Sequence, residues 1–179
     1  MTMRHRRLVR QLAGHDEAKR WQAATELSQV DDPRALRGVR AVLDRNGDEA
    51  ARAAAVYVLG FAGEEDDVEV LARQLSDRNE SPLVRAYAAE ALGHLLQHRL
   101  VPAEARVAVA RSLHDPSPEV RFWSAFAVGV LGLKEARSQL ERLTTDDARV
   151  EGWWTVGEEA VWALRCLDGE EDPPQPERM

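Results

Sequence analysis

The stretch RAYAAEALG at residues 85–93 decides the fold, because three other stretches of the chain share its pattern. They are RWQAATELS at 20–28, RAAAVYVLG at 52–60 and RFWSAFAVG at 121–129. In each, two small or short residues stand three and four positions after the arginine, and a leucine or valine stands seven positions after it. These spacings place the residues on one face of an α-helix, where small side chains let a neighbouring helix approach closely.

A second helix is predicted after each of these stretches, and each of these second helices ends on a leucine: Leu43, Leu75, Leu113 and Leu143. The recurring unit is therefore a pair of helices. Residues 3–13 match only the second helix of such a pair. A terminal helix is predicted at about 150–167, with Gly157 in the position of the arginine. Terminal repeats often depart from the pattern, because one of their faces has no neighbour.

The repeat predicts an all-α fold, an α–α superhelix of about 4.5 helix pairs and nine helices. We expect a single solenoid domain over residues 1–168, with the half-repeat at 3–13, the terminal helix at about 150–167, and pairs at about 17–44, 48–76, 82–114 and 117–144. Residues 169–179 are charged and rich in proline, so we expect a disordered tail there. Left-handed helix caps are predicted at three glycines, Gly60, Gly93 and Gly132.

This pattern resembles HEAT repeats, in particular the short alanine-rich bacterial repeats that are also found in phycobilin lyases. The resemblance covers roughly residues 3–168 and rests on four copies of one motif. It implies an armadillo-like helical solenoid that binds another protein on its concave surface, which we expect the second helix of each pair to form. The implied function is a non-catalytic scaffold or adaptor. An alternative is a phycobilin-lyase-like or other HEAT-fold enzyme that acts on a bound chromophore or base.

The charge of the chain disfavours a general nucleic-acid binder, because a net charge of −7 is repelled by a phosphate backbone. The charge is uneven, at +4 over residues 1–45 and −11 over residues 46–179. The basic N-terminal helices, with RHRRLVR at 4–10, are the part that could follow a phosphate backbone. Nucleic-acid binding through these helices is therefore a second alternative.

The sequence offers no recognisable catalytic or metal-binding constellation. Cys166 is the single cysteine, and the histidine pair with helical spacing, His94 and His98, has no carboxylate at a regular offset. The chain lacks the His-Glu dipeptides on which HEAT-repeat deoxyhypusine hydroxylases carry iron. We therefore predict that the protein is not an enzyme and has no catalytic residues, cofactor or metal.

No apolar run is long enough to span a membrane, and no apolar segment follows the basic start, so we expect a cytoplasmic protein.

The repeated arginines Arg20, Arg52, Arg85 and Arg121 could form an anion-binding row, but a structural role is favoured. Each follows an aspartate: Asp16, Asp44, Asp77 or Asp115. We expect these aspartates to cap the helices and each arginine to pair with an acid of the adjacent turn.

Two adjacent tryptophans, Trp153 and Trp154, lie in an insertion between Leu143 and the terminal helix. The side chains of adjacent residues on a helix point about 100° apart, so one helical face cannot bury both tryptophans. Two roles stay open for them, as exposed anchors for a partner or as a hydrophobic lid over the end of the solenoid. The predicted partner-binding surface combines them with arginines of the second helices that lie off the leucine stripe: Arg37, Arg40, Arg73, Arg106, Arg111 and Arg137.

Overall fold

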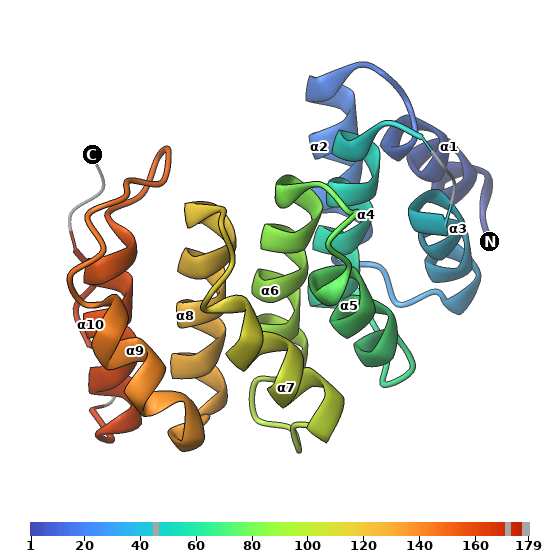
Figure 1. Ribbon diagram of the computed structural model, residues 1–179. Coiled ribbons are helices and arrows are strands. Elements are labelled where there is room, and N and C mark those ends of the chain that lie inside the picture. Colours follow the sequence, from blue (N-terminus) through green and yellow to red (C-terminus); the bar gives the residue numbers. More distant parts are fainter. Residues whose placement is uncertain (45–46, 171–172, 177–179) are drawn as a thin grey trace.

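The computed structural model describes residues 1–44, 47–170 and 173–176 (Figure 1). These residues form ten α-helices and one short 3-10 helix: α1 (Met3–Leu12), α2 (Glu17–Leu27), α3 (Pro33–Asp44), α4 (Glu49–Ala62), α5 (Asp67–Ser76), α6 (Pro82–Leu96), α7 (Ala103–Ser112), α8 (Pro118–Leu131), η1 (Lys134–Ala136), α9 (Arg137–Leu143) and α10 (Val156–Leu167). The all-α prediction is confirmed. The described part has ten helices rather than nine, because one half-repeat, four pairs and one terminal helix make ten. None of these helices is long and apolar enough to cross a lipid bilayer.

The helices stack in two layers, as Figure 1 shows. The even-numbered helices α2, α4, α6, α8 and α10, which we call the even layer, follow one another side by side. The helices α3, α5, α7 and α9 form the odd layer, and α1 packs on α2 and α3 at the N-terminal end. From α4 to α10, neighbours within the even layer contact each other extensively, whereas α5 and α7 contact less and α7 and α9 hardly at all. The even layer is therefore the more tightly packed side of the solenoid.

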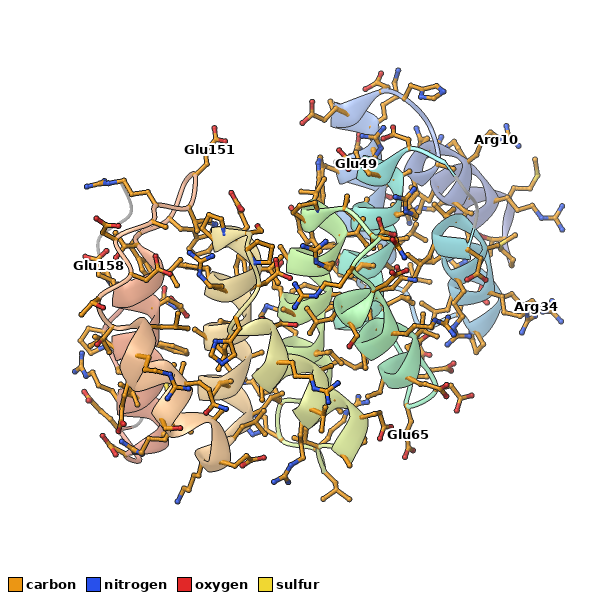
Figure 2. The ribbon with its side chains drawn as sticks, viewed as in Figure 1. Arg10, Arg34, Glu49, Glu65, Glu151 and Glu158 are labelled. Carbon is orange, nitrogen blue, oxygen red and sulfur yellow. The ribbon has the colours of Figure 1, made fainter. Side chains whose placement is uncertain are left out.

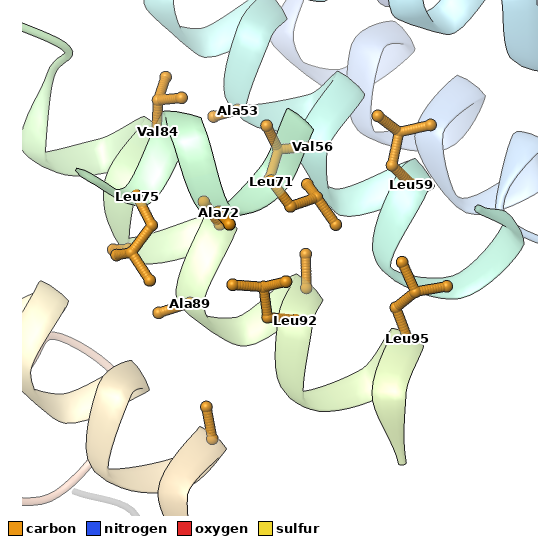
Figure 3. Close-up of a cluster of buried hydrophobic side chains, with 14 of the residues drawn as sticks. Ala53, Val56, Leu59, Leu71, Ala72, Leu75, Val84, Ala89, Leu92 and Leu95 are labelled. Atoms are coloured by element: carbon orange, nitrogen blue, oxygen red, sulfur yellow. The ribbon is translucent and has the colours of Figure 1, made fainter. Parts of the chain in front are cut away.

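The predicted repeat core is buried between the two layers. The small or short residues three and four positions after each repeated arginine are all inaccessible to solvent: Ala23, Ala24, Ala55, Val56, Ala88, Ala89, Ser124 and Ala125. The leucines and valine of the same face are buried with them, and Figure 3 shows this core where α4, α5 and α6 meet. Burial of this continuous apolar layer is the main source of the stability of the fold.

Glycines in the even layer set how closely the helices approach. A Cβ atom on Gly60 would lie 2.8 Å from the Cα of Ala91, and one on Gly129 would lie 2.9 Å from the Cα of Ala163. The predicted left-handed caps at Gly60 and Gly93 are therefore wrong, since both glycines lie within helices. Only Gly132 of the three caps its helix, with a φ of 64°.

The four repeated arginines tie each repeat to the next. Arg20 bonds Asp48 at 2.7 Å, and Arg85 bonds Asp115 at 2.9 Å, while Arg52 and Arg121 make the same link to Glu80 and Asp146. Each arginine also donates to a backbone carbonyl of the loop before its own helix. The structure thus shows the expected ladder. Of the expected aspartate caps, only Asp16 caps its helix, α2. The caps expected at Asp44, Asp77 and Asp115 are wrong, because the N-cap residues of α4, α6 and α8 are Asp48, Ser81 and Ser117.

The C-terminal part differs from the predicted boundaries. The last helix begins at Val156 rather than near residue 150, because residues 148–155 form a turn. Pro173 is buried, and its carbonyl accepts a hydrogen bond from Nε1 of Trp162 at 3.0 Å. Pro173 is thus held against α10, while Pro174 and Gln175 are exposed, and disorder of the tail stays a prediction. Residues 171–172 and 177–179 of that predicted tail lie outside the described residues.

Candidate functional site: an acidic, aromatic groove on the even layer

A groove of about 670 Å³ lies over α4, α6 and α8. Its helical lining residues all belong to these three even-layer helices, and the rest of its wall is the segment at residues 150–153. The expectation that the second helices of the pairs form the hollow surface is therefore wrong. Small residues bring the even-layer helices closer together than their odd-layer partners, and the more closely packed layer lies on the inside of a curved stack.

Four glutamates line the groove, Glu49, Glu90, Glu119 and Glu151, and no described lining residue is basic. Figure 2 shows Glu49 and Glu151 on opposite sides of the molecule's upper edge. Glu49 and Glu119 lie in the first turns of their helices, where a negative charge suits the helix dipole. Glu90 lies in the middle of α6, and its side chain is 14% exposed. The groove thus has three exposed carboxylates at its rim, Glu49, Glu119 and Glu151, and one largely shielded from water, Glu90.

Aromatic side chains form the floor and one wall of the groove: Tyr57, Tyr87, Trp123 and Trp153. They belong to a row of ring contacts that crosses the even layer. Trp21 of α2 lies 5.4 Å from Tyr87 of α6, and Trp123 of α8 lies 5.1 Å from Trp153 between ring centroids. Burial and the nearby charge of Glu90 raise the pKa of Tyr87 to about 12, so this phenol is neutral at neutral pH.

The sequence contained a signal for this row that the repeat analysis missed. Tyr87 and Trp123 stand two positions after their repeated arginines, and Tyr57 and Phe126 stand five positions after theirs. These positions lie on the helix face opposite the small residues of the core. Aromatic residues that recur on an outward face indicate a surface used for binding.

Residues 148–156 form a tight turn in which the two adjacent tryptophans differ in exposure. The N–H of Val156 donates to the carbonyl of Ala148 at 3.0 Å, and Gly152 at the tip has a φ of 75°. Trp154 is 2% exposed and packs with Phe122, whereas Trp153 is half-buried and lines the groove. The prediction of Trp154 as a partner-binding residue is thus corrected, because its ring forms the lid. The two rings contact each other edge to face at 5.4 Å between centroids, with Trp154 on the buried side of the pair and Trp153 on the groove side.

A smaller pocket of about 160 Å³ adjoins the groove and shares Glu90, Trp123 and Trp153 with it. Glu159 of α10 lines this pocket although it is only 2% exposed. Its Oε2 accepts a hydrogen bond from Nε1 of Trp154 at 2.7 Å. Burial among apolar groups raises the pKa of Glu159 to about 8.

The six predicted arginines lie on the odd layer and do not line the groove: Arg37, Arg40, Arg73, Arg106, Arg111 and Arg137. Three of them link successive repeats, since Arg40 bonds Asp67, Arg106 bonds Glu135 and Arg137 bonds Asp168. The other three are exposed on α3, α5 and α7. The structure therefore separates the predicted arginines from Trp153, and a single binding surface does not combine them.

In the part of the chain that the structure describes, the histidines do not assemble with acids or Cys166 into a metal site. His94 stacks on Phe61 at 4.5 Å between centroids and lies 3.8 Å from Glu90, and His98 is exposed. Among the described residues, no group of three or more histidine, cysteine or acidic side chains could hold a metal ion. The absence of a bound metal or cofactor remains a prediction.

Known structures share this arrangement of helices. A chain of the complex of CpcE and CpcF of phycocyanin lyase from Nostoc sp. PCC7120 is 19% identical, with a TM-score of 0.70 over 89% of this chain and 97% of that chain. An engineered protein is 20% identical, with a TM-score of 0.55 over 93% of this chain and 80% of that one. At these identities the likeness concerns the fold alone. None of the curated proteins matches the sequence.

The sequence pattern of HEAT repeats matches residues 6–93 and again residues 73–165. Together these matches span most of the chain, and they cover the helix pairs that the arginine ladder joins. The chain therefore belongs to the HEAT-repeat family.

Proposed function

We propose that this protein is a non-catalytic scaffold whose groove binds a basic segment of another protein. The observation that carries the proposal is the lining of the groove, in which four glutamates and four aromatic rings meet and no described residue is basic. Lysine and arginine side chains are attracted by both kinds of group, by the carboxylates through charge and by the ring faces through cation–π contacts.

The shape of the groove suits an extended segment. Its walls come from three successive helices, so a bound chain would cross α4, α6 and α8 in turn. Half-buried Tyr87, Trp123 and Trp153 supply rigid contact area, which is typical of the residues that contribute most to binding energy. The glutamates at the rim accelerate association and select the sign of the partner's charge.

The odd layer offers a second, separate surface, and its exposed arginines Arg37, Arg73 and Arg111 remain a proposed docking site for an acidic partner. The experiment below distinguishes this proposal from the first, because the two surfaces prefer partners of opposite charge.

A role in chromophore chemistry is the second candidate function, since the phycocyanin lyase chain has the same fold and the groove is in the size range of ligand sites, roughly 300–1,000 Å³. Four glutamates disfavour a ligand with carboxylate groups, so we rank this function below binding of a basic segment. Visible absorbance that co-purifies with the protein from its native cells would favour it.

The test is a titration of the purified protein with three labelled peptides of equal length, one rich in lysine and arginine, one rich in glutamate and one neutral. The basic peptide is expected to bind, with an affinity that falls as salt is added. The double variant Glu90→Gln/Glu151→Gln should weaken it at least about tenfold, because two carboxylates are lost from the groove. The matched control is Glu65→Gln/Glu141→Gln, which removes the same charge at exposed sites away from the groove.

Equal weakening by the two double variants would show that the net charge of the protein, and not the groove, attracts the peptide. Binding of the acidic peptide, abolished by Arg37→Gln/Arg73→Gln, would move the docking site to the odd layer. A preference for nucleic acid that depends on Arg6 and Arg10 of α1 would support the remaining alternative.

A further inference from the structure

The pocket beside the groove is lined by side chains of a restricted kind. Five of its residues are aromatic, namely Phe122, Trp123, Phe126, Trp153 and Trp154. Two carboxylic acids, Glu90 and Glu159, complete it with His94 and Gln175. The charged residues of the repeat ladder do not contribute to its wall.

Glu159 departs from the repeat pattern at its position. It stands two positions after Gly157, where the preceding repeats have Tyr87 and Trp123. A buried carboxyl is costly unless it has a partner. One of its oxygens accepts from Trp154, whereas its Oε1 takes part in no hydrogen bond with a described residue. A carboxyl oxygen that borders an aromatic pocket and has no donor among the described residues is suited to a cationic ligand.

We infer that this pocket binds an alkylammonium group, of the kind that ends a lysine or methylated lysine side chain. The rings surround the methylene or methyl groups and attract the cation through their faces. The carboxyl groups of Glu159 and Glu90 supply the opposite charge. The pocket adjoins the groove, so a lysine side chain bound in it would belong to the basic segment of the proposed function, and this role in protein binding rests on that proposal. The affinity of the pocket for a small free ammonium ion does not depend on the proposed function.

The size of the pocket supports this class of ligand. At about 160 Å³ it is similar to a cavity of roughly 150 Å³ that holds one benzene ring. A single butylammonium or trimethylammonium group fits such a volume. A tetrapyrrole is too large for this volume. Binding of a chromophore in the larger groove is therefore independent of this pocket.

Binding of a cation is coupled to ionisation of Glu159. Because burial holds this carboxyl neutral at neutral pH, an arriving cation favours loss of its proton. The affinity should therefore rise about tenfold per pH unit up to about pH 8 and then level off. The other titratable groups that face Glu159 are Glu90 and His94 of α6 and Cys166 of α10, whose own pKa is raised to about 11 by burial and by the charge of Glu159. A variant of Glu159 separates its contribution from theirs.

The experiment measures tryptophan fluorescence of the full-length protein during titration with butyltrimethylammonium, butylammonium and 2,2-dimethylhexane, the neutral isostere of the first. Three of the five tryptophans line the pocket, so its occupation should change the emission. Saturable binding is expected for the two cations and not for the neutral compound. Glu159→Gln should weaken the cations about tenfold and abolish the rise of affinity towards pH 8.

A second variant, Trp153→Leu, keeps an apolar side chain at this position and removes the indole ring, and it should weaken butyltrimethylammonium more than butylammonium. The control is Glu141→Gln, an exposed site on α9.

Equal binding of the neutral isostere, or an unchanged affinity in Glu159→Gln, would overturn the inference. Competition of butyltrimethylammonium with a lysine-rich but not an arginine-rich peptide would identify a lysine side chain as the source of the group. If peptides bind and small ammonium ions do not, the groove remains and the pocket proposal fails.

Discussion

The indole Nε1 of Trp154 donates a hydrogen bond to Oε2 of Glu159 at 2.7 Å, and this bond joins the inserted turn to the last helix of the solenoid. Both side chains are 2% exposed. The contact closes the C-terminal end of the even layer and leaves a carboxyl group at the wall of an aromatic pocket. It thereby connects the stability of this end with the chemistry of the pocket.

The stability of the protein should fall as pH rises, through Glu159. Its pKa is about 8 in the folded state against 4.5 for the free group, so the folded state holds the proton more tightly. The favourable contribution of the neutral form is complete below pH 4.5 and is lost as pH rises towards 8. Glu159→Gln keeps an acceptor for Trp154 and carries no charge. Its gain in unfolding free energy over the wild type should grow across this interval to a few kcal/mol, on the order of 1.4 per pKa unit.

Urea unfolding at several pH values checks this expectation, with exposed Glu141→Gln as the matched control. Parallel pH profiles for wild type and Glu159→Gln would show that this carboxyl is not the group responsible.

The two adjacent tryptophans should respond differently to truncation. Trp154→Ala removes a buried ring from its cluster with Phe122 and leaves a cavity, so it should lower the unfolding free energy by about 3–5 kcal/mol. Trp153→Ala should cost clearly less, because its ring is only half-buried. Thermal unfolding followed by far-ultraviolet circular dichroism measures both. A smaller loss for Trp154→Ala than for Trp153→Ala would contradict the division into lid and groove residue.

The buried arginine ladder should matter more than the exposed ion pairs. Arg85 is 4% exposed and Asp115 is 3% exposed, so Arg85→Met leaves a buried carboxylate with reduced compensation and should cost about 3–5 kcal/mol. Adding Asp115→Asn should recover part of that loss. For comparison, Arg106→Met breaks a pair with Glu135 in which both side chains are 47% exposed, and it should cost about 1 kcal/mol or less. Chemical denaturation of the three variants tests the ranking, which similar costs for Arg85→Met and Arg106→Met would refute.

Alanine at Gly60 should destabilise the protein although alanine favours helices. A Cβ there would lie 2.8 Å from the Cα of Ala91, which is backbone and cannot move aside locally. We expect a loss of about 1–3 kcal/mol from overpacking between α4 and α6. Gly38→Ala on the odd layer is the control, since its Cβ would meet only the side chain of Val9. A gain in melting temperature for Gly60→Ala would show that the two helices can separate without cost.

The sequence by itself determined the repeat. Small residues three and four positions after Arg20, Arg52, Arg85 and Arg121 specify a helix face that must be buried, and the regular recurrence of that face requires stacked pairs. This information is local, because side-chain spacing along one helix is sufficient to define the face. The paired tryptophans could likewise be recognised as an irregularity, since an insertion that does not match the repeat is visible in the spacing alone.

Only the tertiary structure decided which layer is hollowed and which tryptophan is exposed. The curvature depends on how closely whole helices approach, through contacts such as Gly60 with Ala91, which join residues about 30 positions apart. The fates of Trp153 and Trp154 depend on a turn that is held by backbone hydrogen bonds and by a bond to Glu159. The groove collects side chains from three helices of different repeats and from the segment at residues 150–153, so no single repeat contains its pattern. Contacts between distant residues set these features, and the spacing within one helix carries no record of them.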